Sequence, residues 1–175
     1  GHRWALKFVP AGGADPAHAD NEAAIMTALS HPSLPRIVDA FPVPGAGRCI
    51  VMDYLEGETL LSRSAACGHS LPWRKVVHYG MQLCDLLDYL HSRDSPIVFR
   101  DIKPSNVIVG PGDAVKLVDF GIARTYKAGK EQDTVHVGSV GFAAPELIAN
   151  RQTDHRADLY SLGGLMYFLL SGGQM

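Results

Sequence analysis

Three polar clusters, each directly following an apolar stretch, constrain this 175-residue chain more than any other feature of its sequence. They occupy residues 99–106, 118–121 and 144–146. Brought together, the first two offer Asp101 as a base, Lys103 as a cation, and Asn106 and Asp119 as oxygen ligands. Oxygen ligands suit Mg²⁺, which keeps several waters and is shared with substrate phosphates. Phosphoryl transfer needs such a set, because phosphate charge must be neutralised and the attacking hydroxyl oriented.

The first third of the chain predicts strands around one helix. Residues 4–9 form a short apolar run that is typical of a strand. Asp20 is a candidate cap for a helix, which Pro32 would end. Residues 36–43 and 48–55 are rich in strand-forming residues, and the Pro-Gly-Ala-Gly sequence between them predicts a hairpin.

The rest of the chain predicts mainly helices. The strongest signal covers residues 71–93, where apolar residues recur near a period of 3.6 and Pro72 suits the first turn. Residues 107–109 and 115–118 predict two short strands separated by a Gly-Pro-Gly-Asp turn. Residues 155–170 predict a helix that is apolar on nearly every side and therefore buried. Strands followed by helices predict an α+β fold with a small and a larger lobe.

Composition excludes several classes of protein. A formal net charge of −2 gives no support for nucleic-acid binding. The three cysteines lack a CxxC spacing and the eight histidines form no HExxH pair, so a disulfide framework and a structural zinc site are not expected. A reducing, cytoplasmic location suits these cysteines better. The longest mostly apolar stretch, residues 159–170, is far below the roughly 18 residues that a bilayer span needs, so no membrane segment is expected within this chain.

With these motifs in this order, the chain resembles the eukaryotic-like protein kinase family, in the form typical of bacterial Ser/Thr kinases. The resemblance runs from residues 4–7 (Trp-Ala-Leu-Lys) to residues 158–163 (Asp-Leu-Tyr-Ser-Leu-Gly). It implies a two-lobed fold, with residues 1–54 as a partial N-lobe of antiparallel sheet and one helix, and residues 55–175 as a partial, mainly helical C-lobe. It also implies transfer of the ATP γ-phosphoryl group, with Mg²⁺, to Ser or Thr hydroxyls of a protein substrate.

The resemblance assigns roles to the charged residues of the motifs. Lys7 matches the strand lysine that pairs with the α- and β-phosphates, and Glu22 matches its partner on a helix. Asp101 stands at the position of the catalytic aspartate, and Lys103 at that of the lysine that steadies the γ-phosphate. The two metal ligands are matched by Asn106 and Asp119.

The resemblance also places the base of the nucleotide. Adenine is expected between Ala5 and Ile108. Met52 falls at the gatekeeper position, and the segment from Asp53 to Leu55 would form the hinge, whose backbone reads the edge of the base.

Residues between Asp119 and Glu146 correspond to the activation segment of the family. Thr134 lies where the family places its activating phosphate, and Arg100 matches the arginine that receives this phosphate. Ser139 is expected to help receive the substrate hydroxyl. Glu146 belongs to the Ala-Pro-Glu motif that closes the segment.

The sequence departs from the family at the residue before the Arg-Asp pair, where Phe99 replaces the usual histidine. This side chain is expected to stack with Met26, Ile37 and Phe120, and a phenylalanine can fill that volume without a polar atom to satisfy. Asp158 resembles the buried aspartate that holds the catalytic-loop backbone.

The second departure is the lack of a Gly-rich phosphate-binding loop before Lys7. The helices that follow residues 155–170 in the family are also missing. We therefore expect a fragment of a longer kinase, which by itself binds ATP weakly and turns over little, with the apolar surface of residues 159–170 partly uncovered.

Other interpretations remain open at this point. Lys7 can protect an edge strand, and Asp158 can be a helix N-terminal charge. A catalytically silent, pseudokinase-like nucleotide-binding or scaffolding module is favoured by Phe99 and by the missing loop. A kinase-like fold acting on small molecules is disfavoured by the Asp-Ile-Lys-Pro and Ala-Pro-Glu sequences.

Overall fold

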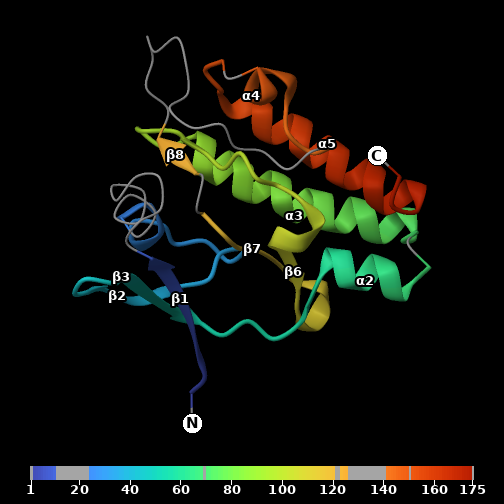
Figure 1. Cartoon of the computed structure of the whole chain (residues 1–175). Coiled ribbons are helices and arrows are strands. Elements are labelled where there is room, and N and C mark those ends of the chain that lie inside the picture. The colour runs from blue at the N-terminus through green and yellow to red at the C-terminus, as the bar shows by residue number, and fades with distance from the viewer. Residues whose placement is uncertain are drawn as a thin grey trace.

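The computed structural model of the chain describes residues 2–10, 24–68, 70–120, 123–125, 141–149 and 151–174. An antiparallel sheet from the N-terminal part lies beside a larger, mainly helical part (Figure 1). In the helical part, α3 (Trp73–His91) and α5 (His155–Ser171) run alongside each other. This arrangement confirms the expected α+β fold.

The N-terminal sheet has the strand order β1 (Trp4–Pro10), β3 (Gly47–Asp53), β2 (Ile37–Val43), with both pairs antiparallel. The expected hairpin joins β2 to β3, although β3 ends two residues earlier than predicted. Exposure alternates along β1, as expected for a strand with one covered face. Lys7 lies directly opposite the fully buried Ile50, so its side of the sheet faces the core of the protein.

The segment between the sheet strands connects the sheet to the helical part. Residues 24–27 are helical, while Asp20 lies outside the described residues. The Ser33 carbonyl accepts a hydrogen bond from the Leu117 N–H (2.9 Å), and the Ser30 N–H donates to the Tyr89 hydroxyl (3.0 Å). These bonds hold one end of the sheet region against the helices.

Short strands build two further small sheets. The first has the order β4 (Glu58–Thr59), β6 (Val107–Val109), β7 (Val115–Leu117), and the second pairs β5 (Ile97–Val98) with β8 (Arg124–Thr125). The two strands predicted around the Gly-Pro-Gly-Asp turn are confirmed, with β7 ending one residue early. The turn itself contains the 3-10 helix η2 (Pro111–Asp113), and a second 3-10 helix, η1 (Pro104–Asn106), precedes β6.

Helix α2 (Leu60–Ala66) was not expected from the sequence. Thr59 caps it, since its hydroxyl accepts a hydrogen bond from the Ser62 N–H (3.1 Å). A seven-residue helix that buries only Leu60 and Ser64 has too few turns to display a periodic apolar pattern.

Helix α3 begins at Trp73 rather than at residue 71, because Pro72 is its N-cap and not part of its first turn. Its buried side follows the predicted apolar positions and faces α5. Gly80 allows the two helices to come close, because a Cβ at this position would lie 3.0 Å from the Met166 Sδ of α5. Helix α5 is capped by Asp154 and ends at Gly172, which has the left-handed φ of 81° that favours glycine.

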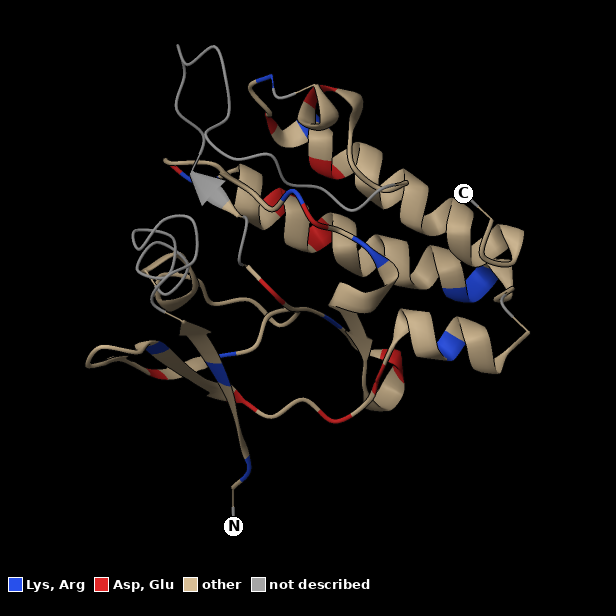
Figure 2. Cartoon of the chain, in the orientation of Figure 1, with Lys and Arg blue, Asp and Glu red and all other residues tan. Residues whose placement is uncertain are grey.

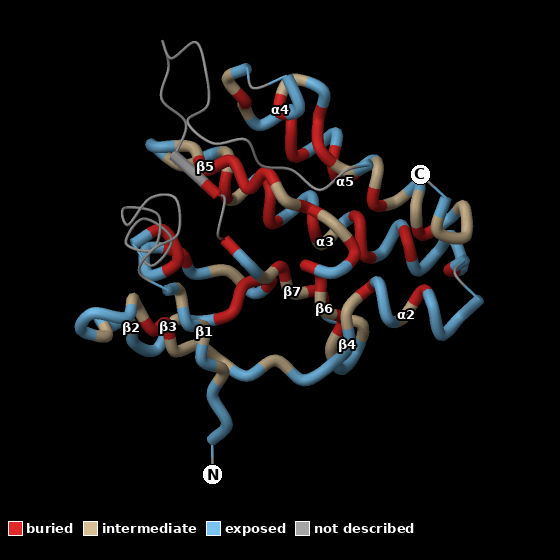
Figure 3. Tube along the Cα trace, in the orientation of Figure 1, coloured by how far each residue is buried: buried red, intermediate tan, exposed pale blue. Residues whose placement is uncertain are grey.

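The main core lies between the helices and the small sheets, where the buried positions concentrate (Figure 3). Burial of α5 is less complete than its composition predicts. Leu162, Leu165 and Leu169 are buried, whereas Leu159 and Tyr160 are about half exposed. An uncovered apolar surface on this helix was expected.

A polar cluster joins α2, α3 and the η2 turn. The Asp113 carboxylate accepts hydrogen bonds from Arg63 (2.9 Å), from the Tyr79 hydroxyl (3.0 Å) and from Lys75. The hydrogen bond from Lys75 holds the pKa of Asp113 below its ordinary value.

Acidic and basic residues are interspersed along both the sheet and the helices (Figure 2). Among the described residues, none of the helices has the length and the apolar character required to cross a bilayer. Short helix α4 (Pro145–Ile148) contains the end of the Ala-Pro-Glu motif.

Candidate active site

The loop between β5 and β6 places Asp101 among polar partners. Its carboxylate Oδ2 lies 2.7 Å from Lys103 Nζ and accepts a hydrogen bond from Asn106 Nδ2 at 2.8 Å. The same amide also donates to the Asp101 carbonyl at 3.0 Å. Asn106 can span both acceptors because η1, started by Pro104, turns the chain back toward the aspartate. The sequence-predicted residues Asp101, Lys103 and Asn106 therefore form one cluster.

Asp119 follows β7 and connects this cluster to the N-terminal sheet. Its Oδ1 lies 2.6 Å from the Nζ of Lys7 on β1, 112 residues away in the chain. The preceding residue, Val118, donates its N–H to the Asn106 carbonyl at 2.9 Å. Asp119 has a φ of 72°, a strained backbone conformation of the kind found at functional sites. The ion pair of Lys7 with Asp119 was not foreseen.

Asp158, near the start of α5, holds the backbone of the loop between β5 and β6, as predicted. It has no exposed surface, and its two oxygens accept hydrogen bonds from the Phe99 N–H (2.9 Å) and the Arg100 N–H (2.7 Å). Arg100 has a φ of 68°, so these bonds fix the loop where its backbone conformation is least favourable.

His91 at the end of α3 is a member of the site that the sequence did not reveal. Its Nε2 lies 2.8 Å from Asp158 Oδ2, the same oxygen that accepts from Phe99. Only the fold brings it to Asp158, which is 67 residues away.

The aromatic substitution at Phe99 preserves the packing behind the site. Phe99 is fully buried, and its ring meets that of Phe120 edge-on, with centroids 4.9 Å apart and an interplanar angle of 88°. Met26 belongs to the same core cluster and Ile37 packs against it. Of the expected stack, the structure shows the contact of Phe99 with Phe120, and it places Met26 and Ile37 in the same hydrophobic core.

The residues expected around adenine lie on the sheet and on β6. Ala5 and Met52 are direct partners across β1 and β3, whereas Ile108 lies on β6 of the second sheet. The Asp53 N–H donates to the Arg36 carbonyl (3.0 Å), so this N–H is already engaged. Leu55 follows in the connection to β4.

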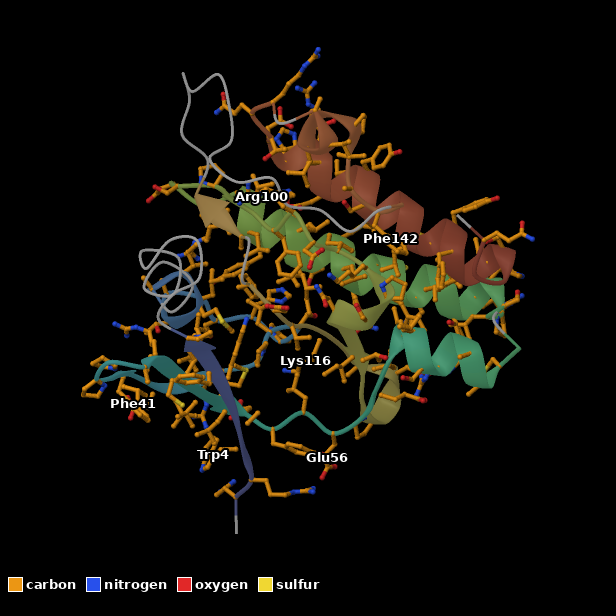
Figure 4. All side chains as sticks on the ribbon, viewed as in Figure 1. Trp4, Phe41, Glu56, Arg100, Lys116 and Phe142 are labelled. Atoms are coloured by element: carbon orange, nitrogen blue, oxygen red, sulfur yellow. The ribbon has the colours of Figure 1, made fainter. Side chains whose placement is uncertain are left out.

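Several predicted site residues lie outside the described residues, namely Glu22, Thr134 and Ser139. Arg100, which is labelled in Figure 4, is described and is almost completely buried. Glu146 lies on α4 and lines an open surface cavity of about 430 Å³. Its carbonyl accepts a hydrogen bond from the Arg151 N–H (2.9 Å).

The donor set fits a divalent cation shared with phosphates better than a cation held by protein alone. Within the part of the chain that the structure describes, no three His, Cys, Asp or Glu side chains gather in a way that could hold a metal ion. Asn106 and Asp119 offer one amide and one carboxylate oxygen donor. Mg²⁺ is commonly bound by one or two such protein groups, with waters and phosphate oxygens completing its shell.

Comparison with known proteins agrees with this arrangement. The chain matches the protein kinase domain over residues 1–175. It is 36 % identical over 171 residues to serine/threonine-protein kinase 36 of Pongo abelii, covering 96 % of this chain and 13 % of the relative. It is 35 % identical to serine/threonine-protein kinase pkn2 of Myxococcus xanthus and to myosin light chain kinase 3 of Homo sapiens, covering 86 % and 87 % of this chain and 18 % of each relative. The chain thus spans less than a fifth of the length of these relatives.

Proposed function

The chain belongs to the protein kinase domain family, and on that premise we propose that it is the catalytic core of a Ser/Thr protein kinase. It would transfer the γ-phosphoryl group of ATP to a Ser or Thr hydroxyl of a protein substrate. Two of the relatives described above are named serine/threonine-protein kinases, which supports this class of hydroxyl.

The observation that carries the proposal is one unbroken chain of contacts through four candidate residues. Lys7 contacts Asp119, the residue before Asp119 bonds to the Asn106 carbonyl, and the Asn106 amide bonds to Asp101. These residues come from the sheet, from the segment after β7 and from the loop after β5. Phosphoryl transfer depends mainly on positioning and on charge stabilisation, which such a rigid cluster provides.

Lys7 and Asp119 are the proposed phosphate and metal groups. In the present arrangement each neutralises the other at 2.6 Å. The two side chains are 31 % and 50 % exposed, so both are accessible to a nucleotide. When ATP binds, we expect Lys7 to turn to the α- and β-phosphates and the Asp119 carboxylate to turn to the metal ion.

Asp101 is the proposed acceptor of the substrate proton. Its Oδ2 is oriented by Lys103 and Asn106, which would position the carboxylate to accept the proton of a substrate hydroxyl. In the transfer step the bond between the γ-phosphorus and the bridging oxygen of ADP breaks. The new bond forms to the substrate oxygen, whose proton passes to Asp101. Lys103 lies close enough to Asp101 to stabilise the charge of the transferred group.

We assign the metal site to Asn106 and Asp119, with Mg²⁺ as the cation. When bound, the ion would neutralise the charge of the nucleotide phosphates. The Asn106 amide nitrogen bonds to Asp101, so its Oδ1, which accepts a hydrogen bond from the Ser105 hydroxyl (3.4 Å), would be the coordinating atom. For the base of the nucleotide, we propose contacts from Ala5 and Ile108 and from the segment of residues 52–55.

All three cysteines are free thiols, which supports a reducing, cytoplasmic location.

The proposal is tested by Asp101→Asn in the full-length protein. We expect phosphorylation of a generic protein substrate to fall by about 10²–10⁴-fold, because the proton acceptor is lost. Binding of ATP with Mg²⁺ should remain, because Lys7 and Asp119 are untouched. Asp94→Asn is the matched control, since Asp94 is exposed in the turn that follows α3.

A phosphorylation rate that is unchanged in Asp101→Asn would contradict the proposed role of this carboxylate. Binding of ATP without measurable phosphorylation by the unmodified protein would contradict the proposed kinase activity and indicate a scaffolding module.

A further inference from the structure

Arg3 makes two contacts with the segment that joins the N-terminal sheet to the helical part. This segment, residues 54–57, follows β3 and leads into β4. One guanidinium nitrogen of Arg3 lies 2.6 Å from Glu56 Oε1, and the guanidinium carbon lies 4.6 Å from the centroid of the Tyr54 ring. At this distance a cation is attracted to the face of an aromatic ring. Arg3 therefore holds the first and the third residue of the segment at once.

The contacts of Arg3 also fix which side of the segment faces outward. Because one guanidinium group touches both side chains, Tyr54 and Glu56 lie on the same side of the segment. Both are exposed, whereas Leu55 between them is partly buried. Figure 4 labels Glu56 on this segment. The burial pattern thus agrees with an outer side formed by Tyr54 and Glu56 and an inner side formed by Leu55.

The other end of the segment is fixed by close packing of the backbone. Gly57 has a φ of 137°, and a Cβ at this position would overlap the Val109 carbonyl oxygen, so the approach requires glycine. Val109 lies on β6 directly after Ile108, and Arg3 lies two residues before Ala5. The segment is thus attached at its two ends beside the two residues that we propose for contact with the base.

We propose that Arg3 is a positioning residue for nucleotide binding, which holds residues 54–56 in place for the base of ATP. This inference rests on the proposed function, in which the backbone of this segment reads the edge of the base. A segment that is already held in place loses less conformational freedom when a ligand binds, so the affinity for the ligand is higher. Arg3 acts through Tyr54 and Glu56 and has no part in the transfer step.

The expected effect is moderate, because both charged groups are largely in contact with solvent. The side chains of Arg3 and Glu56 are 66 % and 64 % exposed. An exposed ion pair is weak and is screened by salt, and an exposed cation–π contact is of similar strength. We therefore expect loss of the guanidinium group to weaken nucleotide binding roughly three- to tenfold at low ionic strength.

Calorimetric titration with ADP and Mg²⁺, together with steady-state kinetics, tests the proposal on the full-length protein and on Arg3→Gln. We expect the Kd for ADP and the KM for ATP to rise by the same factor, while kcat stays unchanged because only binding is affected. The increase should shrink at high ionic strength. Arg74→Gln is the matched control, because Arg74 is an exposed arginine over the Trp73 ring (4.9 Å) on α3 and should leave all three constants unchanged.

The partner of the ion pair provides a second, independent variant. Glu56→Gln should weaken ADP binding in the same direction as Arg3→Gln. The reversed pair, Arg3→Glu combined with Glu56→Arg, should recover part of the affinity that Arg3→Glu alone loses. A general loss of folding would not be recovered by reversing the two charges.

Unchanged ADP affinity in Arg3→Gln would overturn the inference, and so would an equal loss in Arg74→Gln. A lower kcat with an unchanged KM for ATP would also overturn it, since Arg3 would then act on the transfer step. If the unmodified protein does not bind ADP with Mg²⁺, the proposed function is wrong and this inference is wrong with it. If circular dichroism shows that Arg3→Gln does not fold, Glu56→Gln replaces it with the same expected result.

Discussion

The contact between His91 and Asp158 gives the sharpest prediction for the catalytic loop. Asp158 is a carboxylate with no exposed surface and three donors, the Phe99 N–H, the Arg100 N–H and His91 Nε2. The substitution His91→Leu removes one donor and keeps an apolar side chain of moderate size. The Asp158 carboxylate is then positioned less firmly, and so is the loop with Asp101, because this carboxylate accepts hydrogen bonds from the loop backbone.

The expected size of the effect comes from the hydrogen bond itself. A hydrogen bond to a charged group contributes about 1.5–3 kcal/mol, and removing it leaves a buried carboxylate oxygen with one donor fewer. If this free energy is lost from the positioning of the loop in the transition state, kcat should fall roughly 10- to 100-fold. About 1.4 kcal/mol in the barrier corresponds to a tenfold change in rate. The KM for ATP should change little, because Lys7 and the hinge segment are remote from this contact.

The assay is steady-state phosphorylation by the full-length protein, with thermal unfolding measured on the same samples to correct for the folded fraction. His78→Leu is the matched control, because His78 is exposed on the same helix and contacts Gln82 instead. His91→Gln keeps an N–H donor and should recover part of the lost kcat. Unchanged kcat per folded molecule in His91→Leu, or an equal loss in His78→Leu, would refute the reasoning.

Three further outcomes are expected. Asp119→Ala should abolish both phosphorylation and Mg²⁺-dependent ATP binding, measured by calorimetry, and retention of tight Mg²⁺-dependent binding would contradict the assigned metal ligand. Asp113→Asn should lower the free energy of unfolding near neutral pH, because the Asp113 carboxylate has a pKa below its ordinary 3.8 in the fold, through its hydrogen bond with Lys75. This contribution is present above the ordinary pKa and is lost as the pH falls through the lowered one, so the difference from the unmodified protein should shrink in acid denaturation series. Thr134→Ala and Arg100→Ala should each lower activity if a phosphate on the threonine pairs with the arginine, and mass spectrometry that finds unmodified Thr134 in the fully active protein would contradict this.

The elements that the sequence predicted well are those with long or strongly patterned apolar runs. Helix α3 displays a helical period, and α5 is apolar along nearly its whole length. The hairpin of β2 with β3 is indicated by the Pro-Gly-Ala-Gly turn between two runs of strand-forming residues. The missed helix α2 is too short for a period, and its end is set by the Thr59 cap. Which residues of α5 are exposed depends on the elements that pack against this helix, and an apolar composition does not specify those elements.

The sequence by itself determined which chemical groups are present and which segment carries each. Asp101, Lys103 and Asn106 lie within six residues, so one short loop had to bring them together, and the structure shows that it does. The hydrogen bonds of Asp158 to the loop backbone were expected from the resemblance to the kinase family.

Only the tertiary structure decided which distant groups meet. Lys7 contacts Asp119 across 112 residues, and His91 contacts Asp158 across 67. Neither contact leaves a local pattern, because a single charged side chain has no period and its partner is selected by the packing of other elements. The same holds for strand β1, since alternation along it shows that its two faces differ but not which one the core covers.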